Sequence, residues 1–232
     1  MSGRGNGHPL RRALQRYIEK TKMSLLVCFA VKEEAAPFLK GGGGARARVA
    51  VTGMGRRNTA RAWEAALLAG VPGMVLTCGF TGGLKPELKR STVIFETGDA
   101  SLGAVLAECG ALPGRFQCVD RVAATAEEKR TLRHACGADA VEMESAVVQE
   151  ECRKRGIPCA TVRVVLDEAG EDLPLDFNAL MTPEAKISPI KLMGALIRAP
   201  GKIPELIRFQ KQTVAAAGRL GEVLLRVCAP KP

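Results

Sequence analysis

Short apolar runs that end in polar or glycyl residues recur along the chain. The first extends over residues 25–31, the second over residues 49–52 and the third over residues 74–78. Unbroken apolar runs of this length, closed by glycine clusters, are typical of buried strands in an α/β sheet. Residues 58–69 place apolar side chains at helical spacing between the second and third runs, which predicts a strand–helix–strand unit.

A second helix and strand follow further along the chain. Residues 145–155 predict a helix that stops at Gly156, and residues 158–166 predict a strand that ends at Asp167. Because ligands of open α/β sheets bind beyond the carboxyl ends of the strands, we expect one site at this edge of the sheet. The residues that stand at the ends of four predicted strands are Glu34, Gly53–Gly55, Gly79–Gly83 and Asp167.

The positive charge of the chain lies at its two ends. The net charge is +10 over 232 residues, of which residues 1–22 carry +5 and residues 186–232 carry +7. Residues 23–185 are therefore close to neutral, at −2. We expect a basic N-terminal extension over 1–22, an α/β domain with the site over 23–185, and basic amphipathic helices over 186–232 that pack on the domain or extend it. The ends carry no recognisable nucleic-acid motif, so we expect no nucleic-acid partner.

The composition argues against several kinds of site. The eight cysteines are scattered without a CxxC pair, and His8 and His134 are the only histidines. We therefore expect no disulfides, no metal site, no histidine-based triad and no organic cofactor. No apolar run reaches the ~18–20 residues of a membrane span. No apolar stretch with a cleavage site follows Met1, so we expect no signal peptide. We expect a cytoplasmic protein.

Five segments resemble the signature segments of the methylthioadenosine/S-adenosylhomocysteine nucleosidases and their phosphorylase relatives, and they occur in the family's order. The resemblance covers most of residues 23–180. It implies a three-layer α/β/α fold with a central mixed sheet, as in nucleoside phosphorylases, and cleavage of the bond between adenine and ribose. It also implies a homodimer in which a second subunit completes the pocket. The segments are Ala30–Ala35, Thr52–Gly55, Thr77–Leu84, Val141–Ala146 and Val162–Asp167.

The resemblance assigns catalytic roles to three carboxylates. Asp167 matches the acid that gives a proton to N7 of adenine. Glu144 matches the glutamate that binds the ribose hydroxyls and stabilises the positive charge developing on the sugar. Glu34 matches the base that activates a water molecule. From the residues alone, Asp167 also fits a helix cap, Glu144 fits a helix start with Glu142, and Glu34 fits a solvated surface pair with Glu33.

Further substrate contacts are implied along the same segments. Met143 matches the methionine that lies against the sugar ring. Phe80 and Leu166 stand where the family often has serines that support the base and the aspartate, so the site departs from a purely nucleosidase-like one. The remaining residues expected to bind substrate are Glu142, Gly79, Thr81, Gly82 and Ala123.

A glycine turn beside two arginines, over residues 53–57, helps to distinguish phosphate from water as the nucleophile. Backbone N–H groups at Gly53 and Gly55, together with the Arg56 guanidinium, are suited to inorganic phosphate. We therefore expect phosphate as a co-substrate, and phosphorolysis in preference to hydrolysis. The alternative is that the glycines serve close packing and that Arg56 and Arg57 face solvent.

The carboxyl end carries an apolar stripe with basic edges. Ile190, Met193 and Ile197 share one side of a predicted helix, and residues 203–209 repeat the pattern. Such a face suits an anionic membrane surface, although most amphipathic helices pack on their own domain. The segments over 37–48 and 97–117 are short for the family, which implies a pocket open on the 5′ side of the nucleoside.

The basic, proline-broken carboxyl end also resembles the hopanoid-associated phosphorylases. This resemblance implies phosphorolytic release of adenine from adenosylhopane, by an enzyme peripheral to the inner face of the membrane. Two alternatives stay open. One is a hydrolytic methylthioadenosine/S-adenosylhomocysteine nucleosidase. The other is a non-catalytic module that binds a nucleoside or attaches to a membrane.

Overall fold

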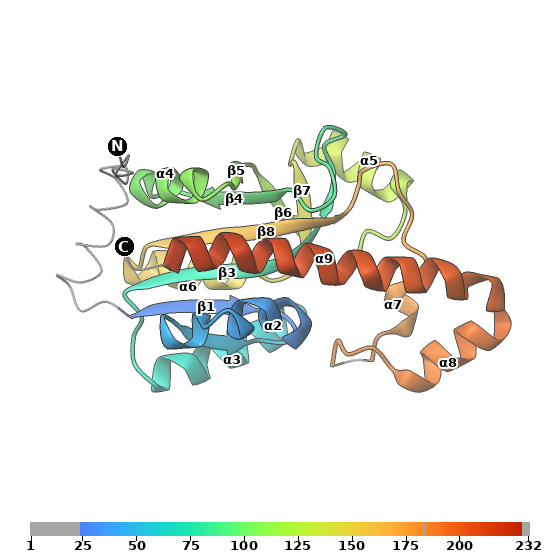
Figure 1. The fold of residues 1–232 in the computed structure, drawn as a ribbon, viewed down its shortest axis with the longest axis horizontal. Coiled ribbons are helices and arrows are strands. Elements are labelled where there is room, and N and C mark those ends of the chain that lie inside the picture. The colour runs from blue at the N-terminus through green and yellow to red at the C-terminus, as the bar shows by residue number, and fades with distance from the viewer. Residues whose placement is uncertain (1–23, 183, 229–232) are drawn as a thin grey trace, which may run out of the picture.

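The computed structural model describes residues 24–182 and 184–228. The N-terminal extension predicted over 1–22 lies outside the described residues. A central sheet is covered by helices on both faces (Figure 1), so the predicted three-layer α/β/α architecture is confirmed. The strands are β1 (Leu25–Phe29), β2 (Arg48–Val51), β3 (Met74–Gly83), β4 (Val93–Thr97), β5 (Leu112–Pro113), β6 (Phe116–Cys118), β7 (Ala140–Glu142) and β8 (Cys159–Asp167).

The sheet is mixed, as expected. Its main path runs in the order β2-β1-β3-β8-β4-β5, and β7 and β6 continue from the end of β3. The strands β2, β1, β3 and β8 are parallel, whereas β4 runs antiparallel to β8 and β7 runs antiparallel to β3. The carboxyl ends of four parallel strands therefore meet at one edge of the sheet.

The strand β3 is longer than the sequence predicted. It continues beyond the apolar run 74–78 and through the glycine cluster, because it pairs with β8 along almost its whole length. The register shifts between Thr81 and Gly82, so that Gly82 lies opposite Asp167. This irregularity, a common device next to functional sites, sets where the last residue of β8 lies relative to β3.

The helices form two unequal layers. Side chains of α2, α4 and α9 join the larger apolar cluster on one face, and side chains of α3 and α6 form the smaller cluster on the other. The helix α5 packs beside β7 at the edge where the strands end. The bounds are α2 (Lys32–Lys40), α3 (Arg56–Leu68), α4 (Ala100–Glu108), α5 (Ala126–Cys136), α6 (Ser145–Arg155), α7 (Phe177–Leu180), α8 (Pro189–Arg198) and α9 (Ile203–Cys228).

The second half of α9 completes the core of the domain. Ala216, Leu220 and Leu224 are fully buried there, in the same cluster as the strands. The helix approaches α2 so closely at Gly221 that an added Cβ would lie 2.9 Å from Cβ of Pro37. This half of α9 therefore packs on the domain.

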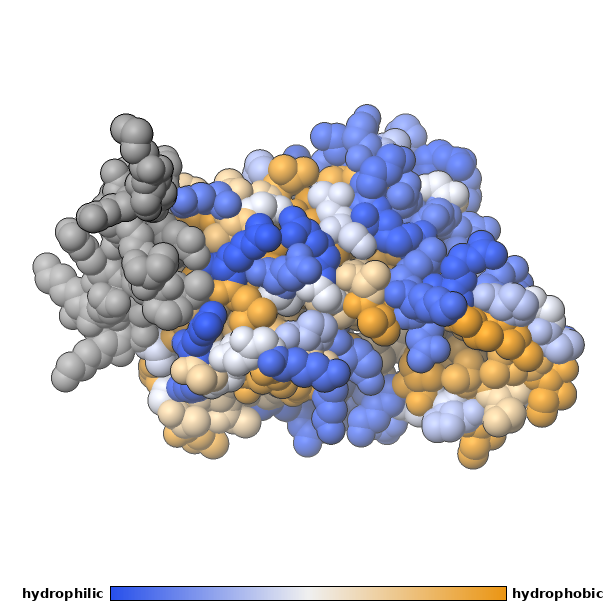
Figure 2. Space-filling view, viewed as in Figure 1, coloured by the Kyte–Doolittle hydropathy of each residue, from blue (hydrophilic) through white to orange (hydrophobic). Residues whose placement is uncertain are grey.

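The helix α8 and the start of α9 extend the molecule instead (Figure 1). Ile190, Met193 and Ile197 on α8 are 85%, 60% and 74% exposed. The alternative that this stripe packs on the domain is therefore wrong for α8. Figure 2 shows hydrophobic surface gathered at this end of the molecule, with hydrophilic surface beside it. Within the described residues, every helix is too short or too polar to cross a bilayer.

Candidate active site

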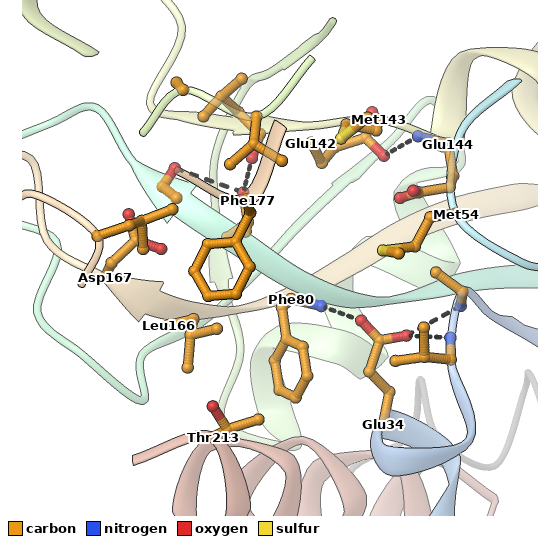
Figure 3. A pocket seen from close by; sticks show the side chains of 18 of the residues that line it. Glu34, Met54, Phe80, Glu142, Met143, Glu144, Leu166, Asp167, Phe177 and Thr213 are labelled. Atoms are coloured by element: carbon orange, nitrogen blue, oxygen red, sulfur yellow. Dashed lines mark hydrogen bonds between the residues drawn. The ribbon is translucent and has the colours of Figure 1, made fainter. Parts of the chain in front are cut away.

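A cavity of about 440 Å³ opens at the carboxyl ends of the parallel strands. Its walls come from the β1–α2 turn, from β3, from the β7–α6 junction and from the end of β8, with the carboxyl-terminal helices closing one side. Figure 3 shows Glu34, Glu144 and Asp167 entering it from three separate elements. The predicted site residues that line it are Glu34, Phe80, Thr81, Gly82, Ala123, Glu142, Met143, Glu144 and Asp167.

Glu34 is buried at the start of α2. Its Oε2 accepts hydrogen bonds from the backbone N–H groups of Ala30 and Val31, at 2.9 and 3.0 Å, and Oε1 accepts one from Phe80 at 2.8 Å. Because Glu34 is only 4% exposed, the surface-pair alternative is wrong, although Glu33 is exposed. Burial raises the pKa of Glu34 to about 7, against the opposing effect of Arg163 and the backbone donors. This carboxyl can therefore take up and release a proton near neutral pH.

Gly79 leaves room behind that carboxylate. A Cβ at this position would lie 2.5 Å from Nη1 of Arg163 and 2.6 Å from Oε1 of Glu34. No side chain fits there without displacing one of the two charged groups. Gly79 is not among the residues that line the cavity, so its place in the site is to let Glu34 and Arg163 approach each other.

Arg163 is the buried cation behind the pocket. Its Nη2 lies 2.6 Å from Oε2 of Glu142 and 3.5 Å from Oε2 of Glu144. Burial opposes its charge, but Glu142, Glu144 and Glu34 together raise its pKa, so the guanidinium stays charged. Arg163 lies in one of the five signature segments, but the family resemblance assigned it no role. The signal in the sequence was a lone arginine among the mostly apolar residues of a predicted strand.

Glu142 and Glu144 lie two residues apart and have different environments. Glu142 accepts hydrogen bonds from the Ser145 hydroxyl at 2.6 Å and from the N–H groups of Ser145 and Glu144 at 2.7 and 2.9 Å. Burial alone would raise the pKa of Glu142, but Arg163 and these donors hold it below its usual value. Glu142 therefore fixes the start of α6, as the helix-start alternative expected.

Glu144 keeps more capacity to accept hydrogen bonds. Its Oε1 accepts one from the Gly55 N–H at 3.0 Å, and its Oε2 lies at the longer distance from Arg163. Burial raises the pKa of Glu144, Arg163 opposes this and Glu142 adds to it. A carboxylate in this position is suited to accept hydrogen bonds from sugar hydroxyls.

Asp167 ends β8 and is 8% exposed at the cavity wall. Its Oδ2 pairs with Nζ of Lys129, which is fully buried on α5. Burial raises the pKa of Asp167, and Lys129 opposes that rise. Lys129 was not among the predicted site residues, although the capping box of Thr125 and Glu128 indicates a helix start just before it. Leu166 lines the cavity and offers no hydrogen bond from its side chain.

The carboxyl-terminal helices give the cavity an apolar wall that sequence reasoning did not foresee. Phe177 of α7 and Phe209 of α9 lie with ring centroids 5.7 Å apart. Met181 and Ile187, between α7 and α8, line the same side. An apolar substituent of a ligand can be buried against this wall.

The three predicted phosphate ligands already have protein partners. The Gly53 N–H donates to the Ala30 carbonyl at 2.9 Å, the Gly55 N–H donates to Glu144, and Nε of Arg56 lies 2.8 Å from Oδ1 of Asp120. Gly55 and Arg56 line a separate cavity of about 350 Å³, and none of the three residues lines the main one. Phosphate binding stays a prediction.

Comparison with known proteins finds similar sequences and solved structures of the same fold. The sequence profile of the Phosphorylase superfamily matches residues 110–198. The aminodeoxyfutalosine nucleosidases of Helicobacter pylori and Campylobacter jejuni are 36% identical over 69 residues and 39% identical over 61 residues. These stretches cover 30% and 26% of this chain, and the chain spans only 30% and 27% of the length of the two relatives.

Solved structures resemble the whole fold. A futalosine hydrolase of Helicobacter pylori superimposes with a TM-score of 0.67 at 20% identity, covering 90% of this chain and 98% of the other. The 5′-methylthioadenosine/S-adenosylhomocysteine nucleosidase of Campylobacter jejuni gives 0.66 at 17% identity, covering 89% and 98%. At this identity the likeness establishes the fold alone, and the hopanoid-associated branch stays a prediction. The chain therefore resembles the phosphorylase superfamily in part of its sequence and shares the fold of these nucleosidase structures.

Proposed function

We propose that the protein cleaves the N-glycosidic bond of an adenine nucleoside. The observation that carries the proposal is the shared cavity of Asp167, Glu144 and Glu34. Each of these carboxyl groups is buried and has a raised pKa, and cations support them from behind. Clusters of perturbed carboxyl groups in one cleft mark sites of proton transfer. The curated relatives are named aminodeoxyfutalosine nucleosidases, and the similar structures are those of a futalosine hydrolase and a nucleosidase, which supports the same reaction class.

Each carboxyl group has one part in the proposed reaction. As the bond to ribose breaks, negative charge develops on the purine and positive charge on the sugar. Asp167 gives its proton to the departing base, Glu144 stabilises the cationic sugar through its hydroxyls, and Glu34 takes a proton from the nucleophile. General acid or base catalysis of this kind contributes about 10²–10⁴ in rate.

Water is the nucleophile that the geometry supports best. Glu34 lines the cavity with a pKa of about 7, and such a base is half ionised near neutral pH. The backbone donors expected to hold phosphate are bonded to Ala30 and Glu144 instead. Phosphorolysis is the second candidate, favoured by a cavity beside the site that Arg56, Arg57 and Arg61 line.

The apolar wall supports a nucleoside with an apolar 5′ substituent. Such a group would be buried against the wall made by Phe177, Met181, Ile187 and Phe209. The exposed apolar stripe of α8 follows Ile187 directly in the chain. Both observations suit a lipid conjugate such as adenosylhopane, taken from an anionic membrane on which α8 rests. The homodimer implied by the family resemblance is part of this proposal.

A substrate panel tests the proposal. The purified chain is incubated with adenosine and with adenosines that carry 5′-methylthio, 5′-homocysteinyl and long 5′-alkyl groups, each with and without phosphate. We expect release of free adenine from at least one of them, without a need for phosphate, and fastest with the alkyl series. A strict requirement for phosphate identifies a phosphorylase. Binding of the nucleosides without adenine release identifies a non-catalytic module and rejects the proposal.

A further inference from the structure

Lys129 is enclosed at the edge of the site, with no exposed surface on its side chain. Its ammonium group pairs with Oδ2 of Asp167 and donates to the carbonyls of Glu168 and Glu171, at 2.9 and 2.7 Å. An ammonium group has three N–H bonds, so three oxygens complete its hydrogen bonding. A lysine is rarely buried to this degree unless it is paired, which makes the contact with Asp167 more than a surface ion pair.

The position of Lys129 is fixed from both sides. The capping box of α5 holds the start of the helix, since Thr125 and Glu128 bond each other's backbone N–H groups at 3.2 Å. On the other side, the turn after β8 is closed by the bond from the Glu171 N–H to the Glu168 carbonyl at 3.1 Å. Lys129 therefore links α5 to the turn that follows Asp167, and it holds that carboxyl group against the cavity.

Two other charged side chains face Asp167, Arg90 from the β3–β4 connection and Glu171 from the turn after β8. These two pair with each other, with Nη2 of Arg90 2.6 and 2.7 Å from the carboxylate oxygens of Glu171. Their effects on Asp167 have opposite signs. The effects of Arg90 and Glu171 on the pKa of Asp167 therefore oppose each other. The effect of Lys129 is larger than either of them.

We propose that Lys129 is a positioning residue that sets the proton affinity of Asp167 and holds the acid in place for glycosidic cleavage. The inference rests on the proposed function. When the proton passes from the Asp167 oxygen to the departing purine, a carboxylate remains, and the ammonium group of Lys129 stabilises it without giving up a proton of its own. Asp167 is thereby a stronger acid than burial alone would allow.

Substitution at Lys129 tests the inference through the pH dependence of kcat/KM. The general acid must be protonated, so activity declines as pH rises through its pKa. Lys129→Gln and Lys129→Met remove the charge, and Gln keeps a donor for the two carbonyls. In either variant that folds, we expect the decline of kcat/KM at high pH to shift to a higher pH by about 1–3 units. Lys129→Arg keeps the charge, so we expect this basic limb of the pH profile to stay in place. An unchanged basic limb in the neutral variants, with only a uniform loss of rate, overturns the inference.

A carboxyl titration by carbon-13 NMR separates this inference from the proposed function, because it needs no turnover. The Asp167 signal is assigned by its loss in Asp167→Asn and followed with pH in the full chain and in Lys129→Gln. A higher pKa in the variant supports the inference even if no adenine is ever released, which would reject the proposed function alone. An equal pKa in both proteins overturns the inference whatever the activity.

Discussion

Nη2 of Arg163 and Oε2 of Glu142 lie 2.6 Å apart in the wall behind the pocket, and solvent reaches neither side chain to more than 1%. The same guanidinium lies 3.5 Å from Glu144, and its charge also acts on Glu34. The charge of Arg163 therefore stabilises three carboxylates: Glu142, which fixes the start of α6, and Glu144 and Glu34, which act in the proposed reaction. Removing it would leave uncompensated negative charge in a low-dielectric site.

We expect Arg163→Met to destabilise the fold by about 3–5 kcal/mol, the usual result of breaking a buried ion pair by removing one partner. Urea unfolding of the purified variant measures the change. Arg153→Met is the matched control, because Arg153 pairs with Glu150 on the exposed face of α6, and we expect it to unfold with the parent protein. Equal midpoints for the two variants would contradict the role assigned to Arg163.

The pKa of Glu34 predicts the acid limb of the activity. A general base must be ionised, and burial raises the pKa of this group to about 7. Activity should therefore fall below about pH 7, by tenfold per pH unit once Glu34 is protonated. Glu34→Gln should lose about 10²–10⁴ in kcat and lose this limb as well. Steady-state rates between pH 5 and 9 give both results.

The control for Glu34 is Glu64→Gln, on the exposed surface of α3. This variant should keep both the rate and the pH profile of the parent protein. A Glu34→Gln protein that still shows the acid limb would assign that limb to another group and would remove Glu34 from the proposed mechanism.

Much of the fold was predictable because it depends on local patterns. The helix over 145–155 and the strand that ends at Asp167 were predicted with bounds within one residue of those observed. The strand β3 was predicted too short, because glycines normally end strands and only pairing with β8 extends it through Gly79. That pairing is a long-range contact, which no local sequence pattern predicts.

The charged partners of the site were not predictable in the same way. Lys129 lies 38 residues before Asp167 in the chain, and only the packing of α5 against the turn after β8 brings them together. The apolar wall has the same cause, since Phe177 and Phe209 belong to different helices. The bonds from the Gly53 and Gly55 N–H groups to Ala30 and Glu144 are long-range contacts of the same kind, which the sequence does not reveal.

The apolar stripe of α8 predicts binding to anionic membranes. The full chain should sediment with vesicles of phosphatidylcholine and phosphatidylglycerol, and the double change Ile190→Ser and Ile197→Ser should release most of it, since both side chains are over 70% exposed. Binding should also weaken as salt is raised, because basic side chains flank the stripe. Leu68→Ser, 91% exposed on α3, is the control. Equal retention of all proteins would contradict membrane docking.

The aromatic wall predicts selectivity for the 5′ substituent. Phe177→Ala should lower kcat/KM for a long 5′-alkyl adenosine by about 10-fold to 100-fold, from the ~1.5–3 kcal/mol of burying an apolar side chain. Adenosine itself should be affected much less, because its 5′ hydroxyl does not need this wall. Parallel kinetics with the two substrates measure the ratio. A similar loss of kcat/KM for both substrates would contradict this selectivity and would show that Phe177 supports the pocket as a whole.

The proton donor is the part of the mechanism on which the rest depends. Asp167 and Glu144 line one cavity, and each has the burial and the charged neighbour that the reaction needs. The most direct measurement is the rate of adenine release by the parent protein and by Asp167→Asn on the best substrate of the panel. We predict a loss of at least about 100-fold in kcat for Asp167→Asn, with the nucleoside still bound. Equal rates for the two proteins would contradict it.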